Sequence, residues 1–333
     1  MNPRFRRLLI PGLLVALLVV VVVASIARRA DGATADSTVV SRMSDPRITE
    51  SSGLAVSRRH PDLAYTVNDS GHGPIVFAVR ISTGAVVGTT RAEGVRWRDT
   101  ESMALTPDGT LWVGDTGDNF GVRQDVALYS MPEPGTGDHV VRPKRYGYSL
   151  PTGPEDVEGI ALQPSTGRFL LMGKGLTGGR VYRLPKTLRE DRPNRAEELD
   201  WTTPVLTTDS ATTPDGRYVL VRNYTVAQVR DARTWKLLHT DELPEQAQGE
   251  TIAPEPSGKS YLIGSEGADS ALLRLGLTAA ADPTPAPTST PSVAEPKADR
   301  DTTGGTPPWA VWGSALGGVI VLAGAAAWIT RRR

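Results

Sequence analysis

The sequence predicts an all-β protein of the β-propeller class, with about five blades of four strands each. Five segments share one pattern: an acidic residue, a short apolar strand, a turn rich in Pro, Gly and Asp, and a second strand. Their starts lie 51, 57, 51 and 41 residues apart. Units of several short strands repeated every 40 to 50 residues are typical of propellers, whose blades stack around an axis.

The repeated segments begin at Glu50, Glu101, Glu158, Asp209 and Glu250. Each is predicted to form a β-hairpin, because PDG, PSTG or PSG places turn-forming residues between runs of β-branched and aromatic residues. A second hairpin is expected in residues 74–90 and, about three periods later, in residues 226–240. Residues 127–135, 180–186 and 271–277 occupy the place of a third strand.

The last segment has only three recognisable strands, whereas residues 37–43 form a spare strand before the first segment. We therefore expect this N-terminal strand to complete the last blade and close a ring of five. Six blades are the alternative, because the linker in residues 186–200 has no clear pattern. A β-sandwich would also contain many short strands, but it does not require an acidic residue at a fixed place in each unit.

The N-terminal segment, residues 1–35, is predicted to be a signal peptide or an uncleaved signal anchor. Arg4, Arg6 and Arg7 precede an apolar run over residues 8–27, and Ala33 and Ala35 offer a cleavage site. Both alternatives export the propeller domain, residues 37–278.

The C-terminal segment in residues 309–330 has no charged residue and is predicted to be a transmembrane helix of about 33 Å. Three arginines follow at 331–333, which places this short tail in the cytoplasm. Residues 279–308, rich in Pro, Thr and Ala, are expected to form an extended stalk. The sequence thus predicts a cell-surface protein whose membrane partner is its own C-terminal helix.

Composition excludes several classes of function. The chain has no cysteine, which excludes thiol catalysis and cysteine metal sites. Eight of the 37 basic residues flank the two apolar segments, whereas all 37 acidic residues lie between Asp31 and Asp301, an excess of eight negative charges. This balance argues against nucleic acid and favours cations or neutral ligands.

Candidate site residues gather where first strands start and second strands end, because antiparallel neighbours bring these two places together. The candidate metal ligands are Glu50, Asn68, Glu101, Asp115, Glu158, Glu250 and Glu266. The other candidate ligand-binding residues are Asp69, Asn119, Lys174, Asp209, Arg222 and Asn223. Asp99, Asp118 and Asp156 lie close by in the sequence and could contribute.

So many carboxylates cannot all stay charged without compensation, since like charges raise one another's pKa. A bound cation, proton sharing or ion pairs would each relieve the repulsion, and Ca²⁺ suits carboxylate, amide and backbone oxygens. The carboxylates could instead be structural, or bind a ligand without metal. Lys174 and Arg222 would form either an anion site or salt bridges to Glu158 or Asp209. His72, in NDSGHGP, is a candidate general base or simply an exposed loop residue.

These segments resemble a bacterial propeller family described as phytase-like with esterase-like activity, over residues 41–277. The resemblance rests on ESSGLA with NDSG, DTESMAL with GDTGDN, EDVEGIAL, TPDGRYVLVRNYT, and QGETIA with GSEG. They are more distantly similar to the gluconolactonase and strictosidine-synthase propellers. The gluconolactonase resemblance implies a divalent cation on a glutamate, an asparagine and an aspartate, for which Glu50, Asn68 and Asp115 are the matching types. The phytase-like resemblance implies calcium-dependent hydrolysis of phosphate esters, although few basic residues lie near the expected axis.

Two functions are therefore expected from different classes. One is binding or metal-dependent hydrolysis of a small polar ligand, an ester, lactone or phosphoester, at the central axis. The other is a non-catalytic surface interaction module whose carboxylate ring is structural. Fold alone does not decide between them.

Overall fold

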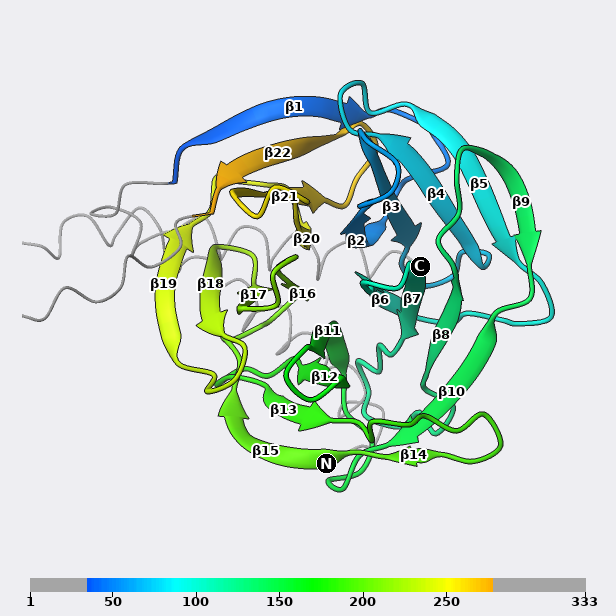
Figure 1. Cartoon of the computed structure of the whole chain (residues 1–333), viewed down its shortest axis with the longest axis vertical. Helices are drawn as coiled ribbons and strands as arrows, with labels where there is room; N and C mark the ends of the chain where they lie inside the picture. The colour runs from blue at the N-terminus through cyan, green and yellow to red at the C-terminus, as the bar shows by residue number, and fades with distance from the viewer. Residues whose placement is uncertain (1–34, 278–333) are drawn as a thin grey trace, which may run out of the picture. The chain divides into compact units, whose positions relative to one another are not determined.

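The computed structural model describes residues 35–277, which form five β-sheets arranged as blades around one axis (Figure 1). The predicted five-bladed propeller is confirmed, and neither six blades nor a sandwich is found in this part of the chain. The apolar segments 8–27 and 309–330 and the stalk lie outside the described residues. Within residues 35–277, the structure contains no helix with the length and apolar character needed to cross a membrane.

Each blade runs from an inner strand at the axis to an outer strand at the rim (Figure 1). Blade 1 contains β2 (Ser51–Val56), β3 (Leu63–Asn68), β4 (Ile75–Arg80) and β5 (Val86–Ala92). Blade 2 contains β6 (Thr100–Leu105), β7 (Thr110–Asp115), β8 (Ala127–Pro132) and β10 (Lys144–Ser149). Blade 3 contains β11 (Val157–Gln163), β12 (Arg168–Gly173), β13 (Arg180–Arg183) and β15 (Glu197–Thr202). Blade 4 contains β16 (Asp209–Thr212), β17 (Tyr218–Arg222), β18 (Val226–Asp231) and β19 (Leu237–Glu242).

Blade 5 is closed by the N-terminal strand, as the sequence predicts. Its strands β20 (Gly249–Pro254), β21 (Ser260–Ser265) and β22 (Ser270–Gly276) come from the end of the domain, and β1 (Ser37–Met43) forms the outer edge. The pairing of β1 with β22 is antiparallel and runs from Ser37 opposite Leu275 to Met43 opposite Ser270. The ring therefore closes by hydrogen bonds between the two ends of the domain.

Two short strands cover the rims of blades 1 and 2. The strand β9 (Gly137–Val141) leaves blade 2 and pairs in parallel with β5, and β14 (Asn194–Arg195) pairs in parallel with β10. At Gly88 a Cβ would lie 2.4 Å from the carbonyl oxygen of Gly137, so only glycine allows this approach. The pairing satisfies backbone groups that an outer edge would otherwise expose.

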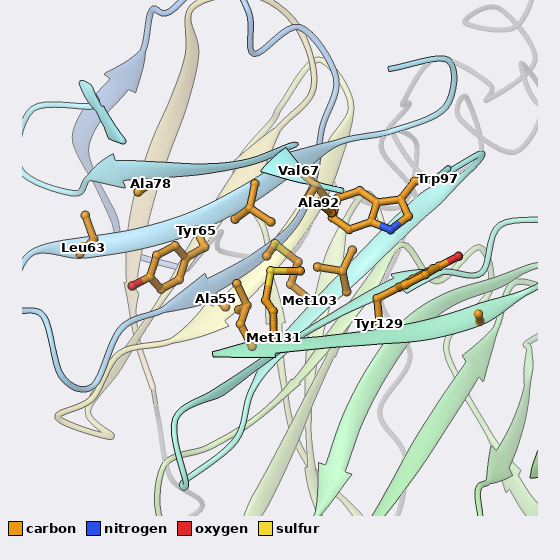
Figure 2. Packing of buried hydrophobic residues seen from close by; sticks show 14 residues of the cluster. Ala55, Leu63, Tyr65, Val67, Ala78, Ala92, Trp97, Met103, Tyr129 and Met131 are labelled. Atoms are coloured by element: carbon orange, nitrogen blue, oxygen red, sulfur yellow. The ribbon is translucent and has the colours of Figure 1, made fainter. Parts of the chain in front are cut away.

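Apolar side chains fill the spaces between neighbouring blades. Figure 2 shows the cluster between blades 1 and 2, in which Tyr65 of β3, Met103 of β6, Tyr129 and Met131 of β8, and Trp97 meet. The rings of Trp97 and Tyr129 lie 5.9 Å apart and tilted, a favourable aromatic arrangement. Fully burying a large apolar side chain of this kind contributes about 1.5–3 kcal/mol.

A fully buried carboxylate closes the axis at the level of the inner strands. Asp209 Oδ1 accepts hydrogen bonds from Ser102 Oγ at 2.6 Å and from the Ser210 amide, and Oδ2 accepts one from the Ile252 amide at 2.9 Å. Ser102 Oγ in turn accepts the amide N–H of Ile160. These hydrogen bonds, here called the polar knot, join β16, β6, β20 and β11 across the axis.

Candidate metal centre

In three inner strands, a glutamate lies where the pairing with the next strand is interrupted in the same way. The pairing register shifts around Glu101 in β6, around Glu158 in β11 and around Glu250 in β20. A residue left out of the ladder at such a bulge has its side chain turned away from the regular alternation. All three glutamates are buried, with 2–5% of their surface exposed.

The other two acidic starts of the repeat lie elsewhere. In blade 1, Ser51 pairs with Asn68, and in blade 2, Thr100 pairs with Asp115 in the same way. The position of Glu101 in blade 2 therefore corresponds to Ser52 in blade 1. Glu50 lies two residues before this position. In blade 4, the ladder of β16 has no irregularity, and Asp209 belongs to the polar knot on the axis. The fivefold carboxylate ring expected from the sequence is thus a set of three glutamates.

Aspartates from the adjoining loops complete two overlapping groups of carboxylates. Asp69, Asp99 and Glu101 each place an oxygen within 4.8 Å of the others, and so do Glu101, Asp156 and Glu158. Asp69 directly follows β3, whereas Asp99 and Asp156 directly precede β6 and β11. Glu101 is common to both groups and stands at the centre of the acidic face.

The backbone of Gly117 lies directly against the carboxyl groups of Glu101 and Asp99. A Cβ on Gly117 would lie 2.3 Å from Glu101 Oε1 and 2.6 Å from Asp99 Oδ2. The amide of Gly117 donates to the carbonyl of Asp99 at 3.1 Å, which holds its backbone against both carboxyl groups. The two oxygens therefore lie against the bare backbone of Gly117, in the space that a side chain would otherwise fill.

Burial and mutual repulsion raise the pKa values of the acidic groups. Burial, followed by the charges of Glu158, Asp69 and Asp99, raises the pKa of Glu101 well above its usual value. Burial and the charge of Asp69 raise the pKa of Asp99 to about 7, and the Asp69 and Asp99 carboxyls share a hydrogen bond that requires a proton. These shifts mean that the site favours added positive charge, whether protons or a cation.

Lys174 offsets part of the negative charge. Its Nζ lies 2.8 Å from Glu158 Oε1 and 5.9 Å from the centre of the Tyr224 ring. Burial alone would lower the pKa of Lys174, but the charges of Glu158, Tyr224 and Glu250 outweigh it and raise the pKa. Among ion pairs within residues 35–277, only this one involves a member of the two carboxylate groups. Of the two roles expected for Lys174, the structure shows the salt bridge to Glu158.

Glu250 and Glu266 continue the acidic face toward blade 5. Gln248 Nε2 donates to Glu250 Oε1 at 3.1 Å. Burial and the charges of Glu250, Asp69 and Glu50 raise the pKa of Glu266 to about 7. Both residues belong electrostatically to the site, although neither lies within the two compact carboxylate groups.

Glu50, Asn68 and Asp115 are the matching types for a gluconolactonase-like site, and the side chains of Asn68 and Asp115 bind backbone groups of the adjoining loops. Asn68 Oδ1 accepts the amide of Glu50, and its Nδ2 donates to the carbonyl of Arg47 at 2.7 Å. Asp115 Oδ1 accepts the amides of residues 98 and 99 and lies 2.8 Å from Nη2 of Arg123. These two side chains fix the loops that carry Glu50 and Asp99.

Glu50 and the candidate base His72 form a separate contact. The Glu50 carboxylate is 45% exposed, and its Oε2 lies 3.2 Å from His72 Nδ1. The other ring nitrogen of His72 lies 3.2 Å from Thr49 Oγ1. His72 also lines a cavity of about 380 Å³, together with Pro74, Val95, Arg96, Trp97 and Arg98. The loops that form this cavity follow Asp69 and precede Asp99 in the chain, and the carboxylates themselves are not part of the cavity wall.

Three other candidates make contacts within the protein or lie at its surface. Arg222 is fully buried, and its guanidinium donates to the carbonyls of Asn223, Thr251 and Gly264 and to Gln246 Oε1. It clamps blade 4 to blade 5 and makes no salt bridge with Asp209 within residues 35–277. Asn223 closes its own turn by accepting the amides of residues 225 and 226, and Asn119 is exposed.

Sequence reasoning placed Asp99 and Asp156 only near the site and did not consider Gly117 or Tyr224. The signal for the two aspartates is their spacing, because each stands two residues before a repeated glutamate. In blade 3, Asp156 Oδ1 is held by the amide of Asp118 at 2.7 Å, which links the GDTGDN loop to the site. No local pattern distinguishes Gly117 from the other glycines of that loop.

Comparison with known proteins finds similarity among solved structures. No protein-family model and no curated protein matches the chain. The chain is similar to a luciferin-regenerating enzyme, with 11% identity and a TM-score of 0.47 over 73% of this chain and 96% of that one. It is similar to a gluconolactonase from Xanthomonas campestris, with 13% identity and a TM-score of 0.42 over 74% and 96% of the two chains. It is also similar to the calcium-binding protein regucalcin from Agrobacterium tumefaciens, with 12% identity and a TM-score of 0.44 over 71% of this chain and 93% of that one.

Proposed function

We propose that the acidic face binds a divalent cation, with calcium as the first candidate, and uses it to bind or hydrolyse a small polar ligand. The observation that carries this proposal is the position of Glu101 Oε1. This oxygen has no hydrogen-bond donor within residues 35–277, faces the bare backbone of Gly117 and belongs to both carboxylate groups. Several carboxylate oxygens presented by loops are a donor set that suits Ca²⁺.

Glu101 would hold the cation together with Asp69 and Asp99 or with Asp156 and Glu158. Within residues 35–277, Asp69 and Asp99 form no ion pair, whereas Glu158 is paired with Lys174. The two aspartates beside Glu101 would therefore gain more from a bound cation. The cavity lined by His72 lies on the loops that follow Asp69 and precede Asp99, and we propose that it holds the ligand.

A cation at this place would polarise an ester, lactone or phosphoester oxygen, or activate a water. Lys174 and Tyr224 would bound the site on the side of Glu158, because Lys174 contacts the Tyr224 ring and donates a hydrogen bond to Glu158. His72 would exchange a proton with a ligand in the cavity by releasing its Nε2 from Thr49 Oγ1, with Glu50 orienting its ring. Hydrolysis of this kind is the activity implied by the phytase-like resemblance.

The competing proposal is a non-catalytic interaction module with a structural carboxylate ring. It is favoured by the contacts that the site already makes within the protein. Lys174 neutralises Glu158, and the Asp69 and Asp99 carboxyls share a proton. If these contacts suffice, the face needs no ion.

Calcium titration of the Glu101→Gln protein separates the two proposals. In the wild-type protein, calcium at a hundredfold excess over its dissociation constant should stabilise the fold by about 2.7 kcal/mol, and a chelator should reverse the rise in Tm. Glu101→Gln should remove most of this response. Glu50→Gln is the matched control, because its carboxylate lies outside both groups and should leave the response intact.

Turnover of an ester, a lactone and a phosphoester should be measured on the same proteins. Loss of turnover together with loss of calcium binding supports the hydrolase, whereas calcium binding without turnover leaves a binding module. A melting curve that ignores calcium and chelator, with Glu101→Gln simply unfolding the domain, would leave the carboxylates as structural clasps.

We further propose that the propeller stands outside the cell, tethered by residues 309–330. The support is the sequence alone, namely the two apolar segments flanked by arginines. Protease added to intact cells should release a soluble fragment ending in the 279–308 stalk. Full protection of the domain, under conditions in which a known surface protein is cleaved, would contradict this topology.

A further inference from the structure

The face opposite the carboxylates carries a second, apolar cavity on the axis. It has a volume of about 240 Å³ and is lined by the ends of all five inner strands and their turns. Ala55, Ala104, Leu162, Ala211 and Pro254 represent the five blades in its wall. An apolar cavity of 150 Å³ is large enough to bind benzene in another protein, so this one has room for a small aromatic or alkyl group.

The polar knot at Asp209 separates this cavity from the acidic face. Asp209, Ser102 and Ile252 meet across the axis between the two ends of the inner strands. The wall of this cavity includes none of the carboxylates of the acidic face, so a ligand bound here would not contact the proposed cation.

One cationic side chain in the wall of the cavity lacks a partner. Within residues 35–277, the guanidinium of Arg58 makes no hydrogen bond and no ion pair, and because Arg58 as a whole is exposed, water and dissolved ligands can reach it. Burial lowers the pKa of Arg58, while the charge of Glu133 acts in the opposite direction. Its neighbour Arg59 differs, because Arg59 Nη2 donates to the carbonyl of Asp108 at 2.6 Å and its side chain is not part of the cavity wall.

The other charged residue of the wall is already occupied. Asp215 Oδ1 accepts Thr213 Oγ1 at 2.7 Å and the amide of Arg217 at 3.0 Å, which closes its own turn. Asp215 keeps its negative charge, but these hydrogen bonds hold it in its own turn, so Arg58 is the charged group of the wall that is free to bind a ligand. A guanidinium binds a carboxylate through two parallel hydrogen bonds, and the single positive charge matches a single negative one.

We propose that this cavity binds a small monocarboxylate with an apolar body, whose carboxylate pairs with Arg58. The apolar body lies among the alanine, leucine and proline side chains at the ends of the inner strands. Because most of the wall is apolar and its charged residues are one arginine and one aspartate, a multiply charged phosphate or a sugar is disfavoured. The site is independent of the cation proposed for the opposite face.

Calorimetric titration with 3-phenylpropionate, and with its neutral amide as the matched ligand, tests the proposal on the full chain. The carboxylate should bind more tightly than the amide, and added chelator should not change its affinity. Arg58→Gln should weaken binding of the carboxylate about tenfold or more, which corresponds to about 1.4 kcal/mol. Arg59→Gln removes the same charge one residue away and should leave the affinity unchanged.

A second variant tests the cavity itself. Ala104 is half-buried and lines the wall, so Ala104→Phe should fill the space and abolish binding while the melting curve stays cooperative. Equal affinity for carboxylate and amide, equal losses in Arg58→Gln and Arg59→Gln, or undiminished binding in Ala104→Phe would each overturn the proposal. No measurable binding of 3-phenylpropionate to the wild-type protein would overturn it as well.

Discussion

Gly117 shows how one backbone position shapes the acidic face. Its missing side chain lets Glu101 Oε1 and Asp99 Oδ2 approach the GDTGDN loop to distances that a Cβ could not tolerate. The loop is held there by the amide of Gly117 and by Arg123, whose guanidinium binds the Gly117 carbonyl and Asp115. The close approach of Glu101 and Asp99 to this backbone is therefore built into the fold and does not depend on a flexible side chain.

Gly117→Ala should weaken calcium binding about tenfold or more while the propeller remains folded. The added methyl group would displace the Glu101 and Asp99 carboxyls from the position where an ion would bind. Calcium titration monitored by Tm or calorimetry measures the effect. Gly73→Ala is the matched control, since a Cβ at Gly73 meets nothing within 4 Å on a neighbouring loop of the same face. Equal affinity in the two variants would contradict the role given to Gly117.

At the scale of the elements, the inner strands explain what the sequence could and could not predict. The hairpins were predictable because their turn residues and apolar runs are local, and β6–β7 and β16–β17 form around PDG turns as expected. The orientation of each acidic side chain could not be predicted, because a one-residue irregularity in the strand pairing decides which way the side chain points. Glu101 lies at such an irregularity, whereas Asp209, which the repeat aligns with it, pairs regularly and turns to the axis.

Contacts between blades could not be predicted from local sequence patterns either. Arg222 looks like a ligand-binding cation in the sequence, yet it donates to carbonyl oxygens of blade 5 that lie 29 and 42 residues away in the chain. The approach of Asp99 to Asp69 likewise depends on the stacking of blade 2 against blade 1. The general location of the site at the strand starts was nevertheless predictable, because it follows from antiparallel pairing alone.

The closing strand β1 gives the prediction at this scale. A chain that begins at Ser44 should melt at a clearly lower temperature than one that begins at Ser37, because removal of β1 exposes the edge of β22. It also removes Met43, which is 1% exposed and packs with Ile48, Phe77 and Val79. Differential scanning calorimetry of the two chains measures the difference. Equal melting temperatures would mean that β1 contributes little to the closure of the ring.

At the scale of the whole molecule, charge is distributed unevenly over the described domain. The acidic face carries Asp69, Asp99, Glu101, Asp156, Glu158, Glu250 and Glu266 against one contacting lysine, whereas the opposite end of the axis is apolar with an unpaired Arg58. The two ends therefore differ in the ligands that they attract. They also differ in their response to pH, because the shifted acidic groups lie on one face.

The metal-free protein should lose stability as the pH rises from 5 to 8. Asp99 and Glu266 have a pKa of about 7 in the folded state, against ordinary values of 3.8 and 4.5, so the folded protein binds more protons than the unfolded chain in this range. The stabilisation is complete below the ordinary values and is lost as the pH passes about 7. Melting curves in the presence of chelator measure it.

Saturating calcium should flatten this pH dependence, because a bound cation replaces the protons on the acidic face. Glu266→Gln should reduce the slope in chelator, since it removes one of the two groups. Surface acids such as Asp108 have a lowered pKa and lose their contribution only below about pH 4, outside the measured window. A metal-free Tm that stays constant or rises between pH 5 and 8 would contradict the assignment.

The pairing of β1 with β22 has a mechanical consequence. Because Ser37 lies opposite Leu275, the chain enters and leaves the propeller at adjacent points of the same blade. Tension applied to both ends would open the two strands one hydrogen bond at a time, like a zipper, and would not shear all of their bonds together. A propeller held at only one end would transmit no load through this seam. Cleavage of the N-terminal segment would therefore decide whether pulling forces can open the ring.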